Sequence, residues 1–378
     1  MESKIYLESK PHYEILDGLR GVAAMIVLVY HLCEGCGIVL GHGYLGVDFF
    51  YALSGFVVGY AYDDRWGKMS VGGFLKRRIV RLHPMVVLGT MLGLLFYYFG
   101  QSAAFPLIGQ SPWWVVVLLA LYTCLMLPMP NAWDVRGWQD FNSFNGNSWS
   151  LYWEYVANIL YAVFFRFLPT AVLVVLTAVA AVGTIDITFN IDMFGVLEGR
   201  VGAPFTVNGG WSLTASELYV GLVRLLYPFL IGLVLSRLKG VIKMAGAFGW
   251  CSLLVGIMFL VPQLNGTLNG VFEAATILLF IPFILSVGAG SSLKGARAKR
   301  ICTFLGDISY PLYITHLPFI YMQIAWMDAH PDAPTSAVIM LAVSLFFVSI
   351  AVAYASLKLY DIPVRKWLTE HWLKHKSA

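Results

Sequence analysis

The chain has 378 residues, of which 59% are hydrophobic and only 12% are charged, with a formal net charge of +4. Soluble domains carry roughly 25% charged residues, so this composition excludes an ordinary soluble enzyme and indicates a polytopic membrane protein. The basic residues gather in short loops and in the tail, which is typical of membrane orientation. We therefore expect contact with membrane lipid and no nucleic-acid partner.

Apolar runs long enough to cross about 30 Å of hydrocarbon recur along almost the whole sequence. No segment between them is long enough for a separate soluble domain, so residues 1–378 are predicted to form a single, all-α membrane domain. The candidate spans are 15–33, 44–62, 82–99, 112–129, 147–167, 169–186, 217–236, 244–262, 271–289, 301–325 and 335–357.

The orientation follows from the basic residues of the loop 63–81, which are Arg65, Lys68, Lys76, Arg77, Arg78 and Arg81. The positive-inside rule places this loop in the cytoplasm, together with the N-terminal segment 1–14 and the basic tail 358–378. Two cytoplasmic termini require an even number of crossings, so we predict a bundle of about ten transmembrane helices. The weakest of the eleven candidates are 169–186, which is short, and 112–129, which is followed by a Pro-Met-Pro break.

The first apolar run contains Asp17, Arg20 and His31. At about 100° per residue Arg20 and His31 lie on one stripe, separated by about 16 Å along the helix axis. Ionisable groups at this depth are costly and usually face a bundle interior or a wet cavity. An imidazole exchanges protons near neutral pH, so His31 is the candidate catalytic base or nucleophile. The structural alternative is a histidine bound to a backbone carbonyl.

The second run contains Asp48 near its outer end. This carboxylate is a candidate for orienting a catalytic histidine, and an N-cap of the helix is the alternative. Pairs of glycines four residues apart, Gly55 with Gly59 and Gly89 with Gly93, predict close helix packing.

Three arginines precede the third run, with Arg77 and Arg81, and Arg78 and Arg81, on shared helix faces. Guanidinium groups bind phosphate oxygens in a forked geometry, so a phosphate-bearing nucleotide is a candidate ligand from the cytosol. An anchor for lipid headgroups is the alternative.

Two later runs carry further polar stripes. Ser150 and Glu154 share a face of the run 147–167, where the glutamate is either a second acid-base group or the partner of an arginine. Ser309, Tyr313 and His316 share a face of the run 301–325, where His316 either binds substrate, supports the site or packs against Tyr313.

The five cysteines predict no disulfide framework. The spacing of His31, Cys33, Cys36 and His42 resembles a metal site, but a small loop beside lipid is a poor setting for a zinc knuckle. We therefore expect no metal.

Taken in order, these segments resemble the acyltransferase-3 family of membrane O-acyltransferases, which includes polysaccharide and lipopolysaccharide O-acetylases. The resemblance rests on Leu16-Asp-Gly-Leu-Arg-Gly with His31, Gly46-Val-Asp-Phe-Phe through Leu53-Ser-Gly-Phe56, Arg78-x-x-Arg81-x-x-Pro84, Trp149-Ser-Leu-x-x-Glu154 and Ser309-Tyr-x-x-Tyr-x-x-His316.

The resemblance implies a bundle of about ten helices that moves an acyl group, usually acetyl, from cytoplasmic acyl-CoA to a hydroxyl of a glycan or lipid-linked saccharide. It assigns catalysis to His31 and donor binding to Arg20, Arg78 and Arg81. From the residues themselves, we expect Asp48 or Glu154 to position the histidine and Arg77 to join the donor site. The candidate substrate contacts are Ser150, Tyr313 and His316. The expected location is the bacterial inner membrane, with polysaccharide-assembly proteins as further partners.

The sequence departs from the family pattern at Asp361, where a glutamate is usual, and it ends at Ala378 without the hydrolase-like domain of some members. Two other hypotheses remain open at this point. The same buried polar stripes would suit a transporter or flippase that moves an unmodified solute. An acyltransferase that uses a phospholipid donor is the other.

Overall fold

A computed structural model describes residue 10 and residues 12–198, 200 and 204–373. This part of the chain is helical and contains no β-strand, as predicted. The expected cytoplasmic segment 1–14 and the end of the tail, 374–378, lie largely outside the described residues. The helices are α1 (Glu14–Gly35), α2 (Gly46–Tyr62), α3 (Val71–Leu95), α4 (Trp113–Thr123), α5 (Ser148–Val163), α6 (Thr170–Thr188), α7 (Ala215–Leu238), α8 (Ala247–Leu260), α9 (Thr267–Ala275), α10 (Ile281–Gly290), α11 (Ala296–Thr315), α12 (Leu317–Ala329), α13 (Thr335–Ser356) and α14 (Ile362–Leu368).

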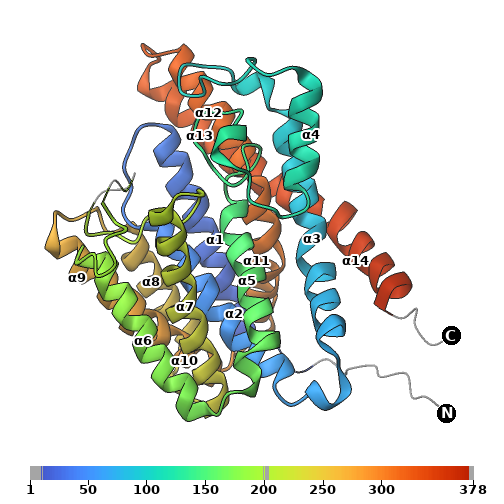
Figure 1. The fold of residues 1–378 in the computed structure, drawn as a ribbon, viewed down its shortest axis with the longest axis vertical. Coiled ribbons are helices and arrows are strands. Elements are labelled where there is room, and N and C mark those ends of the chain that lie inside the picture. Colours follow the sequence, from blue (N-terminus) through green and yellow to red (C-terminus); the bar gives the residue numbers. More distant parts are fainter. Residues whose placement is uncertain (1–9, 11, 199, 201–203, 374–378) are drawn as a thin grey trace.

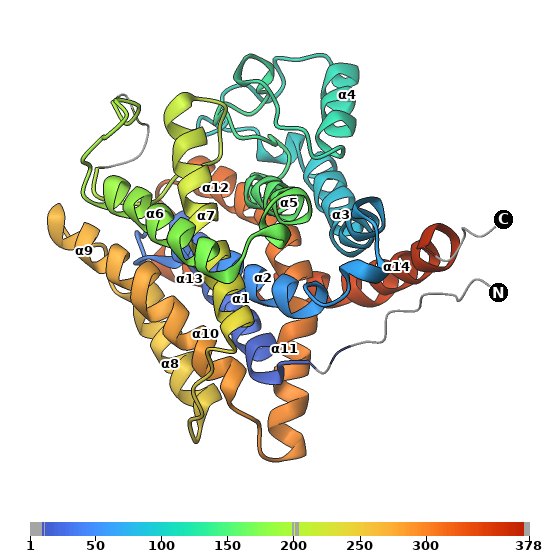
Figure 2. The same cartoon turned by 60° about the horizontal axis from the view of Figure 1, so that its bottom comes forward.

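The long helices form one bundle, with α1 near its centre (Figure 1). Helix α1 packs against α2, α8, α10, α11, α12 and α13. Helix α14 lies beside α3 in both ribbon views (Figures 1 and 2). The residues of the first polar stripe therefore face other helices and not lipid.

Seven helical stretches in the described part of the chain are long and apolar enough to cross a membrane. Helix α4 has 11 residues, or about 16 Å, and is too short to cross. The run 112–129 therefore forms only a short helix, whereas the run 169–186 forms the 19-residue helix α6. Helix α8, with 14 residues, is also short, so the number of crossings stays a prediction.

Glycines allow close backbone contacts at two places in the bundle. A Cβ atom added to Gly55 would lie 2.0 Å from the carbonyl oxygen of Phe229, and one added to Gly232 would lie 2.0 Å from that of Ala52. Helices α2 and α7 therefore meet backbone to backbone, which confirms the packing role predicted for Gly55. A Cβ on Gly93 would lie 1.9 Å from the Phe144 carbonyl oxygen, so α3 holds a loop there instead of a helix.

The predicted continuous span 301–325 is wrong, because the helix breaks at His316 between α11 and α12. Pro318 stands at the start of α12 and has no N–H to donate to the carbonyl of Ile314, four residues earlier. The break places His316 at a helix junction inside the bundle, where its ring has no accessible surface.

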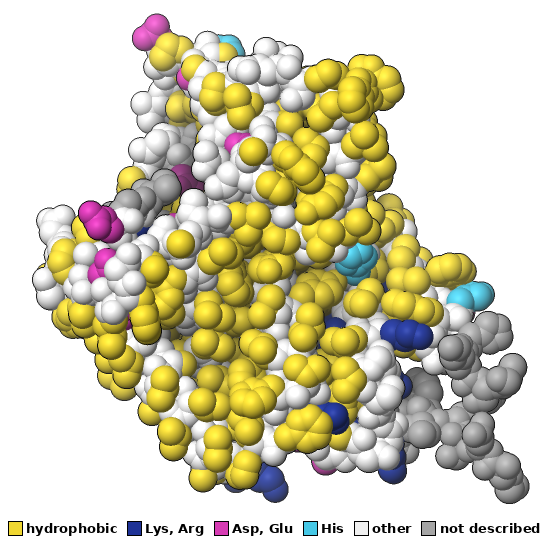
Figure 3. Space-filling view, in the orientation of Figure 1, with side chains coloured by type: hydrophobic (Ala, Val, Ile, Leu, Met, Phe, Trp, Pro, Cys, Tyr) yellow, Lys and Arg dark blue, Asp and Glu magenta, His cyan; other side chains and the backbone are white. Residues whose placement is uncertain are grey.

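On the face drawn in Figure 3, the lysines and arginines lie mostly in the lower half and most acidic groups lie in the upper half. Its middle is mainly hydrophobic, as expected of a surface that contacts lipid.

Candidate active site

Two histidines from distant parts of the chain meet in the bundle. The Nδ1 atom of His31, on α1, lies 2.9 Å from the Nε2 atom of His316, and the rings stack with centroids 5.1 Å apart. His31 keeps some solvent-accessible surface, whereas His316 has none. The residue predicted as the base is thus reachable, and the second histidine is its buried support.

The hydrogen bonds define which nitrogen carries a proton on each ring. His316 Nδ1 lies 2.8 Å from the carbonyl oxygen of Leu312, which can only accept, so this nitrogen donates. In neutral His316 the Nε2 atom is then an acceptor, and His31 Nδ1 donates to it. The lone pair of neutral His31 is consequently on Nε2, which makes no hydrogen bond to the described residues. Neutral His31 therefore has an unbound lone pair on Nε2, which a base needs to remove a proton from a hydroxyl.

The broken helix and the loop before α5 hold His316 together. The Ile314 carbonyl that Pro318 leaves without its helical donor accepts from Asn145 Nδ2 at 2.7 Å. The side-chain amide of Asn147 donates to the Tyr313 carbonyl at 3.0 Å and lies 3.2 Å from His316 Nε2. Two asparagine amides therefore replace hydrogen bonds of the interrupted helix, and one of them also contacts the histidine pair.

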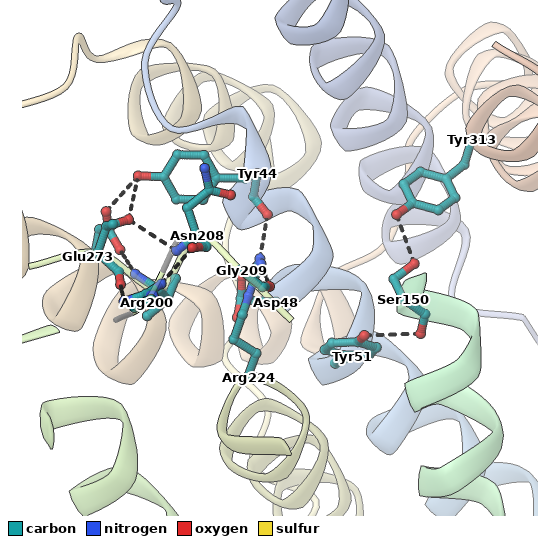
Figure 4. Close-up of polar contacts among 12 residues, drawn as sticks. Tyr44, Asp48, Tyr51, Ser150, Arg200, Asn208, Gly209, Arg224, Glu273 and Tyr313 are labelled. Carbon is teal, nitrogen blue, oxygen red and sulfur yellow. Dashed lines mark hydrogen bonds and ion pairs between the residues drawn. The ribbon is translucent and has the colours of Figure 1, made fainter. Parts of the chain in front are cut away.

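Asp48 lies away from the two histidines, in a buried ion pair. Its carboxylate accepts from Arg224 of α7, at 2.7 Å to NH2 and 3.3 Å to Nε (Figure 4). Arg224 also donates to the carbonyl oxygens of Tyr44 and Gly209, so all three of its nitrogens are bound. Asp48 therefore fixes the start of α2 to α7, and the residue bound to His31 is His316 instead of the predicted Asp48.

Glu154 also pairs with an arginine. Its Oε1 accepts from Arg78 NH2 at 2.7 Å, from Ser54 Oγ at 2.6 Å and from Asn158 Nδ2 at 3.2 Å. This matches the second role considered for Glu154, the partner of an arginine, and no contact joins it to His31. The pair joins α3 to α5, because one residue comes from each helix.

Ser150 and Tyr313 form a hydroxyl pair next to the histidines. The Ser150 Oγ lies 2.8 Å from the Tyr313 hydroxyl, and Tyr51 donates to the Ser150 carbonyl at 3.0 Å (Figure 4). The rings of Tyr313 and His316 are 6.2 Å apart. Because Ser150 Oγ also donates to the Asn147 carbonyl at 3.1 Å, the Tyr313 hydroxyl donates to Ser150 Oγ, and both hydroxyl protons are bound within the protein.

The residues predicted to bind the acyl donor are Arg20, at the other end of the polar stripe of α1, and three arginines of α3. Arg20 donates from Nε to Ser309 Oγ and from NH2 to the Gly306 carbonyl, both at 2.8 Å. Arg81 is exposed, makes no hydrogen bond to the described residues and interacts electrostatically with Arg20, Arg78 and Arg365. Arg77 donates to the Gly73 carbonyl of its own helix at 2.9 Å. The structure thus brings Arg20, Arg78 and Arg81 together and leaves Arg77 on the helix surface.

Sequence reasoning missed Arg224, Asn145 and Asn147. Arg224 had a usable signal, because it is a charged residue inside the apolar run 217–236. The asparagines had none, since their role depends on a helix break more than 160 residues away in the chain.

The side chains considered for a metal are used otherwise. His42 is bound through both nitrogens, to the Val261 carbonyl at 3.0 Å and to Asn269 Oδ1 at 2.8 Å. Cys33 and Cys36 are free thiols. No group of three or more metal-ligating side chains occurs in the described part of the chain.

Residues 13–358 match the family of the acyltransferase domain, the acyltransferase-3 family. The chain therefore belongs to this family of membrane acyltransferases. The match covers every element of the site, from Arg20 and His31 on α1 to His316.

Individual relatives support the same class. Protein 2 in the picA locus of Rhizobium radiobacter is 35% identical over 159 residues, which are 39% of this chain and 80% of that protein. A Staphylococcus aureus protein named "Putative O-acetyltransferase" is 23% identical over 93% of this chain and 57% of its own length. The "Putative peptidoglycan O-acetyltransferase" YrhL of Bacillus subtilis is 24% identical over 84% of this chain and 50% of its own length. The chain thus spans about half the length of the last two relatives. No solved structure matches it at a significant level.

Proposed function

We propose that this chain is a membrane O-acyltransferase that transfers an acyl group, in the first instance acetyl, from acyl-CoA to a hydroxyl of a glycan or lipid-linked saccharide. The observation that carries the proposal is the hydrogen-bond relay from His31 through His316 to the Leu312 carbonyl. It leaves His31 Nε2 unprotonated on an accessible ring, as a general base requires.

In the proposed reaction, His31 Nε2 takes the proton of the acceptor hydroxyl as its oxygen attacks the thioester carbonyl. The carbon–sulfur bond then breaks, and the CoA thiolate takes the same proton from the imidazolium. His316 holds the His31 ring through Nδ1 throughout and does not exchange a proton itself. The Ser150 and Tyr313 oxygens are candidates to accept a hydrogen bond from the substrate, because their own protons are donated within the protein.

The donor would enter at the arginine end of the α1 stripe. Arg81 offers an exposed guanidinium, while Arg20 and Arg78 add positive charge close to it. Phosphate groups held there would leave an extended pantetheine arm to cover the ~16 Å to His31. Arg77 remains a peripheral candidate for the same phosphates, because it lies on the adjacent helix surface.

For location, we propose the bacterial inner membrane with both chain ends in the cytoplasm, so that the arginines meet cytoplasmic acyl-CoA. The basic loop 63–81 and the lower half of Figure 3 support this orientation. The acceptor would arrive at the opposite end, with polysaccharide-assembly proteins as partners. A peptidoglycan acceptor is named for the Bacillus subtilis relative and is one member of the proposed glycan class.

The test is a reconstituted assay with purified protein in liposomes. Acetyl-CoA and a panel of glycans are added, and both free CoA and acetylated glycan are measured. We expect equal amounts of the two products, formed only when an acceptor is present. Transport of an unmodified glycan without consumption of acetyl-CoA would favour a transporter, and glycan acetylation without CoA release would favour a phospholipid donor.

A further inference from the structure

A second basic site lies on the outside of the bundle, between α11 and the C-terminal helix. It is a cavity of about 350 Å³ lined by Lys299, Arg300, Phe304, Asp307, Tyr354 and Lys358, among others. Lys358 belongs to the π-helical segment η7 (Leu357–Asp361), which directly continues α13. Insertions of this kind often occur at functional positions.

The cavity has an excess of positive charge. Lys299, Arg300 and Lys358 are all exposed, and Asp307 is the acidic group that lines it. Lys299 also lies 3.1 Å from Glu14 Oε1, at an exposed ion pair that a stronger anion can displace. Two lysines and one arginine around one space favour a phosphate ligand.

One wall of the cavity is aromatic and continuous with the lipid-facing surface. The Phe304 and Tyr354 rings lie 6.2 Å apart, and both side chains are exposed. In the most apolar stretch of 18 residues within the helical segment 335–373, only 11% of the residues are buried inside the protein. A ligand in this place therefore meets cations at one end and hydrocarbon at the other.

The cavity is distinct from the arginines proposed for the acyl donor. Asp361, one turn after Lys358, has its carboxylate 3.0 Å from Arg365 and interacts with Arg81. Arg20 contacts Gly306 and Ser309 of α11, whereas the cavity is lined by Arg300, Phe304 and Asp307 of that helix. The cavity and the arginines proposed for the acyl donor thus lie on different faces of α11. They also lie beside different turns of the helical segment that begins with α13.

We propose that this cavity binds the headgroup of an anionic phospholipid, with the phosphate between Lys299, Arg300 and Lys358 and the acyl chains along Phe304 and Tyr354. Basic pockets between helices at the cytoplasmic side of membrane proteins bind such headgroups. A nucleotide phosphate carries the same charge but has no acyl chain for the aromatic wall.

Binding of single lipids to the purified, detergent-solubilised full chain tests the proposal. Native mass spectrometry compares dioleoylphosphatidylglycerol with dioleoylphosphatidylcholine. The cavity variant combines Lys299→Gln, Arg300→Gln and Lys358→Gln. Its matched control combines Lys243→Gln, Lys294→Gln and Arg297→Gln, which remove the same charges from exposed positions outside the cavity. A second variant, Lys358→Glu, reverses one charge at an exposed position and leaves the rest of the fold unchanged.

We expect the native chain and the control to bind phosphatidylglycerol at least tenfold more tightly than phosphatidylcholine. The cavity variant and Lys358→Glu should lose this preference while unfolding at the same temperature as the native chain. Equal binding of the two lipids, or an unchanged preference in the cavity variant, would overturn the proposal. Displacement of phosphatidylglycerol by CoA, with loss of CoA binding in the cavity variant, would assign the cavity to a nucleotide instead. Lipid binding is measured without turnover, so a failure here is separate from a failure of the proposed acyl transfer.

Discussion

Two buried polar regions lie on either side of α2 and differ in how completely their atoms are paired. In the region around Arg224, every guanidinium nitrogen donates to Asp48 or to a backbone carbonyl. In the region around His31, one ring nitrogen is bound by His316 and the other has no partner among the described residues. Full pairing holds helices and loops in place, whereas the unpaired nitrogen of the half-buried His31 is the candidate place for chemistry.

The largest effect should come from removing the unpaired nitrogen. We expect His31→Ala to lower the transfer rate by about 10³-fold, because general-base catalysis typically contributes 10²–10⁴. Acetyl transfer by the purified protein measures the rate, and a thermal unfolding profile checks the fold. His330→Ala, at an exposed histidine, is the control that should retain full activity. Substantial transfer by His31→Ala would rule out this residue as the base.

The second effect should come from the fully paired region and appear in stability. Arg224→Met leaves the Asp48 carboxylate buried without its cation, which should cost about 3–5 kcal/mol. The double variant Asp48→Leu with Arg224→Met removes both charges and should recover most of this loss. Unfolding in detergent, followed by denaturant or heat, measures both. If Arg224→Met were as stable as the native chain, the ion pair would not have the structural role assigned to it.

A smaller effect on rate should come from the support of His31. We expect His316→Ala to lower kcat about 10²-fold while the KM for acetyl-CoA stays close to that of the native chain, because misplacing a catalytic group by about 1 Å costs this much. His316→Gln should recover part of the rate, since its amide oxygen can accept from His31 Nδ1. Steady-state kinetics of both variants give the answer. A rate in His316→Ala equal to that of the native chain would remove His316 from the mechanism.

The most local effect concerns the loop that leads to Asn145 and Asn147. Burial and repulsion from Asp134, partly offset by Arg136, raise the pKa of Asp140 in this loop from 3.8 to about 8. A raised pKa means that the folded loop keeps a proton that the unfolded chain releases, so its stability falls as the pH rises from about 4 to 8. Hydrogen exchange of residues 134–147 should therefore become faster over this range in the native chain. In Asp140→Asn the pH-dependent part of the opening free energy should vanish, and an identical pH dependence in both proteins would contradict the assignment.

The pattern of apolar runs was sufficient to predict the class of fold and most of the helices, because each long apolar run indicates a helix by itself. It also singled out His31, Arg20 and His316, since ionisable residues in apolar runs are conspicuous. It could not pair them: His31 and His316 are 285 positions apart, and only packing of α1 on α11 brings them to 2.9 Å. The prediction of Asp48 beside a histidine was wrong, because no local pattern reveals its contact with Arg224, which is 176 positions away in the chain.

The helix break also lay beyond sequence reasoning. Pro318 could have been tolerated as a kink within one span, and its consequence depends on amides supplied by another segment. By contrast, the Pro-Met-Pro break was visible in the sequence, and it marked the run 112–129, which forms the short helix α4, as a weak candidate.

The amides of Asn145 and Asn147 have a consequence for how the reaction is controlled. The loop that carries them ends at α5, covers the broken helix and contacts His316. The position of this loop therefore also determines the orientation of the His316 ring and of the His31 ring bound to it. A large saccharide that pushed this loop aside would also misalign the proton acceptor. In the proposed reaction, an acceptor would therefore be acylated only if it binds without moving this loop.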